Sequence, residues 1–262
     1  MRYYTVLCLF IYSTFFSVSS YSKGVEVNLL IEEGYFPLIV NLQSQQGLAF
    51  EFVDILNESQ TEFEFTINAL PTKRLIKAVQ AGSFDALFLM AVDWLPKASH
   101  SSLVKSQFSV TVENGFYALK EHAADQSYFD NLAGLTKAGV LGYSYKFADY
   151  NTDENYLRNV HRMTLTQSET HVIKMLLYKR ADVGIVGNLA SQYLQKNNGM
   201  DMSLLFKSSK PDQIFNTTFL VNQQSQKITA NQFDKIINQL QTQEKLKAVF
   251  EQYGISSSVK HW

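Results

Sequence analysis

Hydrophobic and polar positions follow two alternating periods in the first half of the chain. Residues 25–31 are rich in β-branched and aliphatic side chains, and residues 63–67 alternate with period two, so both segments predict strands. Residues 50–56 show a helical apolar face, and residues 71–82 predict a helix with proline near its start and glycine just past its end. The apolar run 85–90 is short enough for a buried strand. This order predicts a parallel sheet covered by helices.

The pattern restarts in the second half of the chain. Three strands and two helices are predicted there, the strands at 138–141, 160–165 and 182–186 and the helices at 146–157 and 172–177. Apolar residues at helical spacing over 233–240 and 246–250 predict two further helices near the C-terminal end. Two α/β units of similar design indicate two lobes. No Pro/Gly-rich linker separates them, so we expect short crossings near 112–117 and 214–220 to act as hinges.

The first twenty residues have the pattern of a targeting segment. Arg2 is the only charge before Lys23, and the apolar run between them ends among small residues, which is typical of a secretory signal peptide. We place cleavage after Ser20, with Ser22 as the second choice. The alternative is an uncleaved anchor, but a membrane span needs ~20 mostly apolar residues, and this run is shorter and contains Ser, Thr and Tyr. We therefore expect a periplasmic protein.

Composition narrows the function classes. Lys and Arg number 23 against 24 Asp and Glu, so no basic excess supports nucleic-acid binding. The single cysteine, Cys8, excludes a disulfide framework and a thiolate metal site. The five histidines lack metal-ligand spacing, and the chain has neither a Gly-rich phosphate loop nor a Gly-x-Ser-x-Gly elbow. We expect no metal, no cofactor and no catalytic residue.

Two segments resemble extracellular solute-binding proteins of family 3, which have the type II periplasmic binding fold. The first is Leu-Pro-Thr-Lys-Arg at 70–74 followed by Ala-Gly-Ser-Phe-Asp-Ala at 81–86, and the second is Leu-Tyr-Lys-Arg-Ala-Asp-Val at 177–183. The resemblance implies an α/β fold of two lobes, each a mainly parallel sheet flanked by helices, with two hinge crossings. It places residues 21–114 in lobe 1 and 115–214 in lobe 2, and it returns residues 215–262 to lobe 1 with the C-terminal helices.

The resemblance also implies a function. A monomer would capture a small-molecule solute by closing its lobes and would pass it to the membrane permease of an ABC-type importer. The first alternative is a periplasmic sensor that presents the solute to a membrane signalling receptor. The second is an enzyme similar to cyclohexadienyl dehydratase on the same fold, which would need a crevice carboxylate of raised pKa.

Two cations suggest that the solute is a small organic anion. Arg74 falls in the first turn of the predicted helix after Pro71, and its guanidinium suits a carboxylate, although a surface ion pair is an equal alternative. Lys97 falls where family members usually carry an arginine that clamps a carboxylate, although a solvated loop lysine is an equal alternative. Amino-acid binders commonly have an aspartate at the position of Gly187 and hydroxyl residues at three others, which are here Leu89, Met90 and Val92. The sequence therefore argues against a simple amino-acid ligand.

Each remaining candidate for solute binding could instead have a purely structural role. Ser144 stands at the start of a second-lobe helix, and Gln167 and Ser168 open the helix that follows, so these residues either cap helices or bind solute. Tyr35 and Trp94 follow predicted strands and belong either to the core or to a stacking wall. Asp93 could pair with a ligand amine, as could Glu33, or both could be exposed loop carboxylates.

Overall fold

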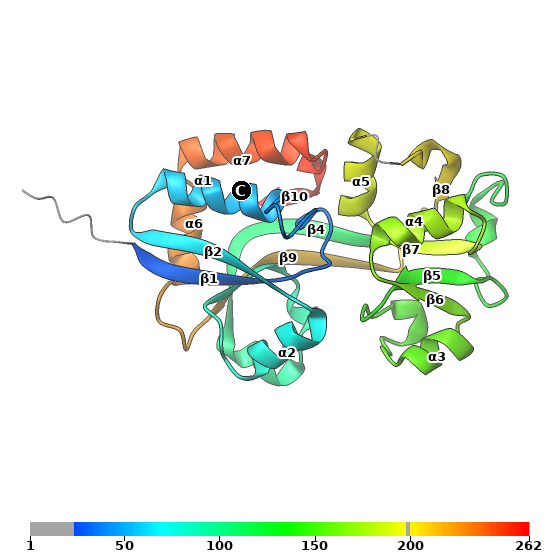
Figure 1. Cartoon of the computed structure of the whole chain (residues 1–262), viewed down its shortest axis with the longest axis horizontal. Coiled ribbons are helices and arrows are strands. Elements are labelled where there is room, and N and C mark those ends of the chain that lie inside the picture. The colour runs from blue at the N-terminus through cyan, green and yellow to red at the C-terminus, as the bar shows by residue number, and fades with distance from the viewer. Residues whose placement is uncertain (1–23, 198–199, 262) are drawn as a thin grey trace, which may run out of the picture.

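The computed structural model describes residues 24–197 and 200–261, so the predicted signal peptide at 1–20 lies outside the described residues. Ten strands join into one continuous sheet in the order β2-β1-β3-β9-β4-β7-β5-β6, with β8 and β10 paired to β4. Figure 1 shows that this sheet spans two lobes, with helices packed against each.

The first lobe contains both ends of the described chain. Its strands are β1 (Val25–Glu32), β2 (Phe63–Leu70), β3 (Ala86–Met90) and β10 (Val259–His261), and its helices are α1 (Leu48–Ser59), α2 (Thr72–Gln80), α6 (Ala230–Ile237) and α7 (Leu240–Gln252). Strand β1 pairs in parallel with β2 and β3. Phe52 of α1 lies at the centre of the core, where its ring contacts Phe88, Phe108, Phe219 and Phe250. Burial of this aromatic cluster by α1 and α7 is the main apolar contribution to the lobe.

The second lobe repeats the design on a smaller scale. Its strands are β5 (Lys137–Val140), β6 (Met163–Thr166), β7 (Val183–Gly187) and β8 (Leu205–Lys207), and its helices are α3 (Glu154–Asn159), α4 (Glu169–Leu177) and α5 (Asn188–Lys196). Strand β5 pairs in parallel with β6 and β7. Apolar residues of α4 cover one face of this sheet, while Leu157, Met163 and Tyr145 belong to a separate cluster.

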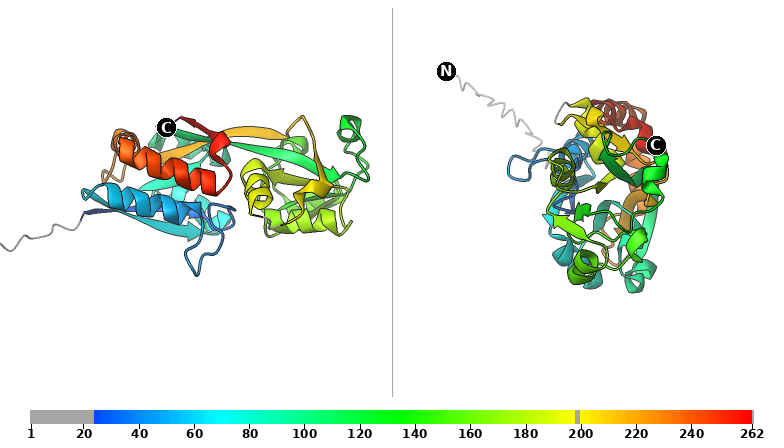
Figure 2. Two further views of the ribbon diagram at one scale, coloured as in Figure 1. Left: turned by 90° about the horizontal axis from the view of Figure 1, so that it is seen from above. Right: turned by 90° about the vertical axis from the view of Figure 1, so that its right-hand side faces the viewer.

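Two long strands connect the lobes along one side of the molecule (Figure 2). Strand β4 (Leu103–Leu119) pairs with β9 (Gln213–Asn222) from Leu103 to Asn114 and then with β7 from Asn114 to Tyr117. The register therefore passes from one lobe to the other at Asn114. This crossing lies in the region that the sequence predicts for a hinge.

The aspartates of the two family-like segments have matching structural roles. Asp85 precedes β3, and its carboxylate accepts a hydrogen bond from the backbone N–H of Asn28 on β1 at 2.8 Å. Asp182 precedes β7 and accepts from the backbone N–H of Thr136, just before β5, at 2.7 Å. Asp85 thus joins the start of β3 to the middle of β1, and Asp182 joins the starts of β7 and β5.

One predicted helix is wrong. Residues 146–157 form two separate pieces, a short 3₁₀ turn at Lys146–Ala148 and helix α3 from Glu154. Asp149 and Tyr150 lie between them with φ of 54° and 58°, and this left-handed backbone ends the first piece. The apolar spacing alone carries no signal of that break.

Candidate functional site

The carboxyl ends of the parallel strands of both lobes face each other where the lobes meet. Five residues come together there, and we call them the lobe junction: Glu32, Tyr35, Thr72, Tyr143 and Glu169. Such strand ends are where α/β sheets bind ligands. The lobe junction therefore comes first as a candidate site.

Glu169 is the most deeply buried acid of the lobe junction. It is the first residue of α4, after the N-cap Ser168, and only 5% of its surface is exposed. Its Oε1 accepts a 2.5 Å hydrogen bond from the backbone N–H of Gly187, at the end of β7. Burial raises the pKa of this carboxyl from its usual 4.5 to about 7; the hydrogen bond from Gly187 lowers it, and the charge of Glu32 is a smaller effect that raises it.

Glu32 approaches the same place from the first lobe. It is the last residue of β1, and its Oε1 accepts from the Thr72 hydroxyl at 3.1 Å. Burial raises the pKa of Glu32 as well. Thr72 also lies against the second lobe, because a Cβ atom on Gly142 would lie 3.7 Å from its hydroxyl oxygen. The lobes are thus in close contact here, and the half-buried carboxyl of Glu32 in one lobe acts electrostatically on the buried carboxyl of Glu169 in the other.

Tyr35 places an unsatisfied hydroxyl beside the two acids. The residue is 6% exposed, and its hydroxyl forms no well-aligned hydrogen bond with any described residue, although the Thr217 side chain lies close enough to act on it. Burial and the charge of Glu169 raise its pKa. Its ring packs edge-on against Trp94, with centroids 5.8 Å apart, and Trp94 packs edge-on against Phe215 at 5.3 Å. A buried hydroxyl without a partner is costly, so it suggests a missing ligand atom.

Tyr143 completes the group from the second lobe. Burial raises its pKa well above the usual range, and the charges of Glu169, Glu32 and Tyr35 add to this effect. The ring also contacts the apolar clusters on both faces of the second-lobe sheet. The lobe junction therefore combines two acids with aromatic walls.

The two predicted cations have exposed side chains. Arg74 and Lys97 are both exposed, and among the described residues neither forms an ion pair. Asp93 is exposed too. Of the eight residues singled out from the sequence, only Tyr35 and Trp94 are brought together. The prediction of an anion held by Arg74 and Lys97 stays a prediction.

The backbone N–H groups at the helix starts of the second lobe donate hydrogen bonds to residues of the protein itself. Ser168 caps α4, where its hydroxyl accepts from the backbone N–H of His171 at 3.4 Å. Gln167 is exposed and lines a shallow hollow beside α4. Near Ser144, the backbone N–H groups of Lys146 and Phe147 donate to the carboxylate of Asp212 at 2.8 and 2.9 Å. These N–H groups are therefore not free to hold a solute carboxylate.

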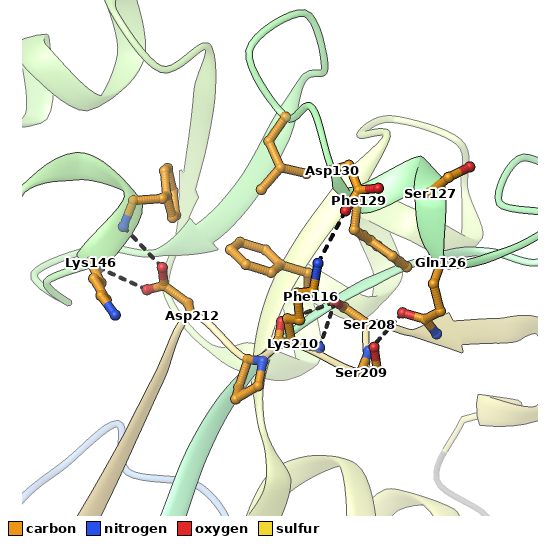
Figure 3. Close-up of a pocket in the computed structure, with 13 residues that line it drawn as sticks. Phe116, Gln126, Ser127, Phe129, Asp130, Lys146, Ser208, Ser209, Lys210 and Asp212 are labelled. Atoms are coloured by element: carbon orange, nitrogen blue, oxygen red, sulfur yellow. Dashed lines mark hydrogen bonds and ion pairs between the residues drawn. The ribbon is translucent and has the colours of Figure 1, made fainter.

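A second candidate is a surface hollow of about 460 Å³ in the second lobe, which we call the lobe-2 hollow (Figure 3). Phe116, Phe129 and Phe147 line it together with Lys146, and Asp212 lies at its edge. Lys210 pairs with Asp130 at 3.4 Å, with both side chains largely exposed. Asp212 and the serines of this hollow already have hydrogen-bond partners, and no buried polar atom of the described residues is left without one here, so the hollow is a weaker candidate than the lobe junction.

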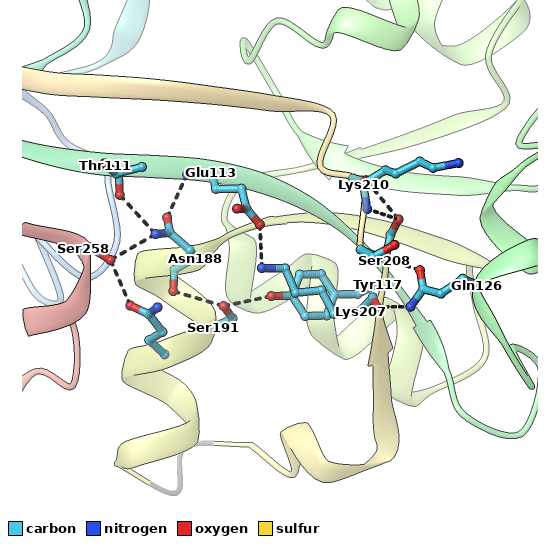
Figure 4. Close-up of polar contacts among 12 residues, drawn as sticks. Thr111, Glu113, Tyr117, Gln126, Asn188, Ser191, Lys207, Ser208, Lys210 and Ser258 are labelled. Atoms are coloured by element: carbon cyan, nitrogen blue, oxygen red, sulfur yellow. Dashed lines mark hydrogen bonds and ion pairs between the residues drawn. The ribbon is translucent and has the colours of Figure 1, made fainter. Parts of the chain in front are cut away.

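A polar network links the second lobe to the crossing strand (Figure 4). The Asn188 side chain, at the start of α5, donates to the carbonyl of Thr111 and accepts from the backbone N–H of Glu113, at 3.1 and 2.9 Å. It also donates to the Ser258 hydroxyl at 3.1 Å. Asn188 therefore ties α5 to β4 just before the register changes lobes.

Neither Glu32 nor Glu169 was identified from the sequence. Glu33, the exposed neighbour of Glu32, was noted instead, because strand periodicity does not say which of two consecutive acids turns inward at a strand end. Glu169 follows an N-cap serine, where an acid usually stabilises the helix dipole. The only available signal was Gly187, whose missing side chain leaves room for the Glu169 carboxyl: a Cβ there would lie 2.7 Å from Oε1.

Solved structures identify the architecture, whereas no family model and no curated protein matches the chain. An ABC uptake transporter substrate-binding protein from Streptococcus pneumoniae with bound histidine is 11% identical, with 88% of this chain and 94% of that chain covered and a TM-score of 0.66. The chain has the type II periplasmic binding fold. This confirms the fold class expected from the sequence.

Two other structures with this fold have different descriptions. A histidine kinase sensor domain with similarity to periplasmic binding proteins is 14% identical over 92% of this chain and 99% of that chain, with a TM-score of 0.63. An ancestral amino acid-binding protein, a precursor of cyclohexadienyl dehydratase, is 14% identical over 88% and 96%, with a TM-score of 0.63. At these identities the likeness establishes the fold and leaves the solute to be argued from the site.

Metal clusters and membrane-spanning helices are both lacking among the described residues. No group of three or more His, Cys, Asp and Glu in residues 24–197 and 200–261 could hold a metal ion. Across the same ranges, no helix has the length and apolarity needed to cross a bilayer.

Proposed function

We propose that the protein binds a small solute at the lobe junction and closes its two lobes around it. The observation that carries this proposal is the meeting of buried polar side chains from both lobes at their strand ends, Glu32 and Glu169 with the unpartnered Tyr35 hydroxyl. Because these groups are buried, a solute reaches them only when the lobes move apart. The crossing strands β4 and β9 supply the hinge for this motion.

The role proposed for this capture is delivery to an ABC-type importer outside the cytoplasm, after export by the N-terminal leader. Structure neighbours described as binding proteins of amino acid ABC transporters support this role. The second candidate is a sensor that presents the solute to a membrane receptor, and the neighbouring histidine kinase sensor domain favours it. Solute capture is common to both, and neither requires chemistry at the lobe junction.

The experiment is a thermal-shift screen of the mature protein with amines, amino acids, dicarboxylates, aromatic acids and sugars. A solute that binds the folded state raises the midpoint by mass action. The bulky variant Thr72→Trp should abolish the response, because Thr72 faces Gly142 across the lobe junction. Thr61→Trp is the matched control, since Thr61 is exposed just before β2, at the end of that strand farthest from Thr72. A response that survives Thr72→Trp would place the solute elsewhere.

A further inference from the structure

The lobe junction contains two acids and no base. Glu32 comes from β1 and Glu169 from α4, and no lysine, arginine or histidine in the described ranges forms an ion pair with either. Two carboxylates buried together repel each other strongly unless one of them holds a proton or a cation lies between them.

A second observation points to a ligand at the same place. The hydroxyl of Tyr35 is buried without a hydrogen-bond partner among the described residues, and the charges of both acids act on it. An ammonium group placed near the acids could donate to this oxygen as well as to the carboxylates. The walls formed by Trp94, Phe215 and Tyr143 suit the apolar part of such a solute and also favour a cation.

The lobe junction offers little to an anion. The strand end at Leu89 and Met90 contributes buried apolar side chains. A carboxylate brought to Glu32 and Glu169 would be the third acid in one buried region.

Resting on the proposed function, we propose that the solute is an organic amine without a carboxylate, and that its ammonium group replaces a proton held between Glu32 and Glu169. In the exchange, the protonated carboxyl gives its proton to water or buffer, and the resulting carboxylate accepts N–H bonds from the ammonium. The net charge of the lobe junction is the same before and after. Binding therefore becomes weaker as the solution becomes more acidic.

Few other titratable groups act on this pair. Those coupled to Glu169 are Glu32 and four tyrosines, namely Tyr35, Tyr117, Tyr143 and Tyr145. Glu33 acts on Glu32 from the exposed side. His171, on the same helix as Glu169, is exposed and bonded to Ser168 at 2.9 Å. The tyrosines stay neutral at physiological pH, so the exchanged proton belongs to the two acids.

The test is titration calorimetry with probes that share one skeleton: 2-phenylethylamine, 3-phenylpropionate, 2-phenylethanol and phenylalanine, with putrescine and histamine as further amines. Running each titration in two buffers of different ionisation enthalpy counts the protons released. We expect at least one amine to bind and to release about 0.9 proton at pH 6, with Kd rising up to about tenfold per pH unit below 7. Glu169→Gln should abolish the release and weaken amine binding at least about tenfold. Glu26→Gln, an exposed acid at the other end of β1, should change neither.

The outcomes separate this inference from the proposed function. If phenylpropionate or phenylalanine binds better than phenylethylamine, or if an amine binds without releasing a proton, the inference is wrong while solute capture stands. If no amine binds but another solute in the thermal-shift screen does, the inference is again wrong. If no solute of any class binds, both proposals fail.

Discussion

The lobe junction and the lobe-2 hollow differ in volume and in the state of their polar groups. The hollow has the volume, about 460 Å³, but its aspartate and serines already have hydrogen-bond partners. The lobe junction holds a buried hydroxyl without a well-aligned hydrogen bond and two acids that form no ion pair with any described residue. In a hinged protein, a site can be filled when the lobes are together, so unsatisfied buried groups indicate it better than empty space does.

The largest expected effect comes from neutralising the buried acid. Glu169 has a folded pKa of about 7 against 4.5, so the unfolded chain loses this proton at lower pH than the folded one. The contribution of this carboxyl to the free energy of unfolding is therefore fully present below pH 4.5. It is lost as the pH rises through 7, by on the order of 3 kcal/mol. Glu169→Gln keeps an acceptor for Gly187, and it should match the natural chain at pH 4 and exceed it at pH 8.

Urea unfolding at the two pH values measures this difference. If Glu169→Gln is no more stable than the natural chain at pH 8, ionising Glu169 does not destabilise the fold. The lobe junction would then no longer differ from the lobe-2 hollow in holding an unfavourable buried acid. Glu26→Gln serves again as the exposed control, because its carboxyl lies at the far end of the same strand.

A substitution in the lobe-2 hollow should lower stability by a comparable amount without changing solute affinity. Asp212→Ala removes the acceptor of two backbone N–H groups and should lower the free energy of unfolding by about 2 kcal/mol. Solute affinity, measured by calorimetry on the folded variant, should stay within about twofold, because the contacts that are lost lie outside the lobe junction. A large fall in affinity would move the site towards the lobe-2 hollow.

Tyr35→Phe should change stability and affinity in opposite directions. Removing a buried hydroxyl that has no partner should raise the free energy of unfolding by about 1 kcal/mol. The same change removes an acceptor for the solute, so Kd should increase several-fold, by about fivefold for a hydrogen bond of about 1 kcal/mol. Denaturant melts and calorimetry on one preparation test both signs. A fall in stability would mean that the hydroxyl is already satisfied in the solute-free protein.

The smallest effect is expected for a lysine of the hollow. Lys146 is exposed and lines the lobe-2 hollow without pairing with any acid among the described residues. Lys146→Ala should change stability by less than about 0.5 kcal/mol and leave solute affinity as it was. Parallel thermal-shift curves with and without solute suffice to detect a departure.

The fold could be predicted much better than the site. Period-two and helical spacing located β1, β2, α2 and α4, and the family-like segments supplied the two-lobed arrangement. The long crossing strand β4 was seen only in part, because its buried pattern over Leu103–Leu119 is irregular where it changes partners. Helix α5 was missed altogether, because one face packs on each lobe: Leu189 lies in the first-lobe core, whereas Ala190 and Leu194 lie in the second.

The site was harder because its chemistry depends on tertiary contacts. Arg74 and Lys97 were chosen for charge and position, which a sequence displays, and their role as an anion clamp remains a prediction. Glu169 acquires its properties from the space that Gly187 leaves and from Glu32, 137 positions earlier in the chain. Burial of an acid and the loss of its usual pKa cannot be deduced from its neighbours in sequence.

Within the one continuous sheet, strand β4 pairs with β9 up to Asn114 and with β7 beyond it, so it runs through both lobes. Opening the molecule must therefore bend an intact ladder of backbone hydrogen bonds. The free energy needed to bend this ladder contributes to the binding free energy of any solute held between the lobes. Substitutions along β4, far from any bound molecule, are then a means of tuning how tightly it holds its cargo.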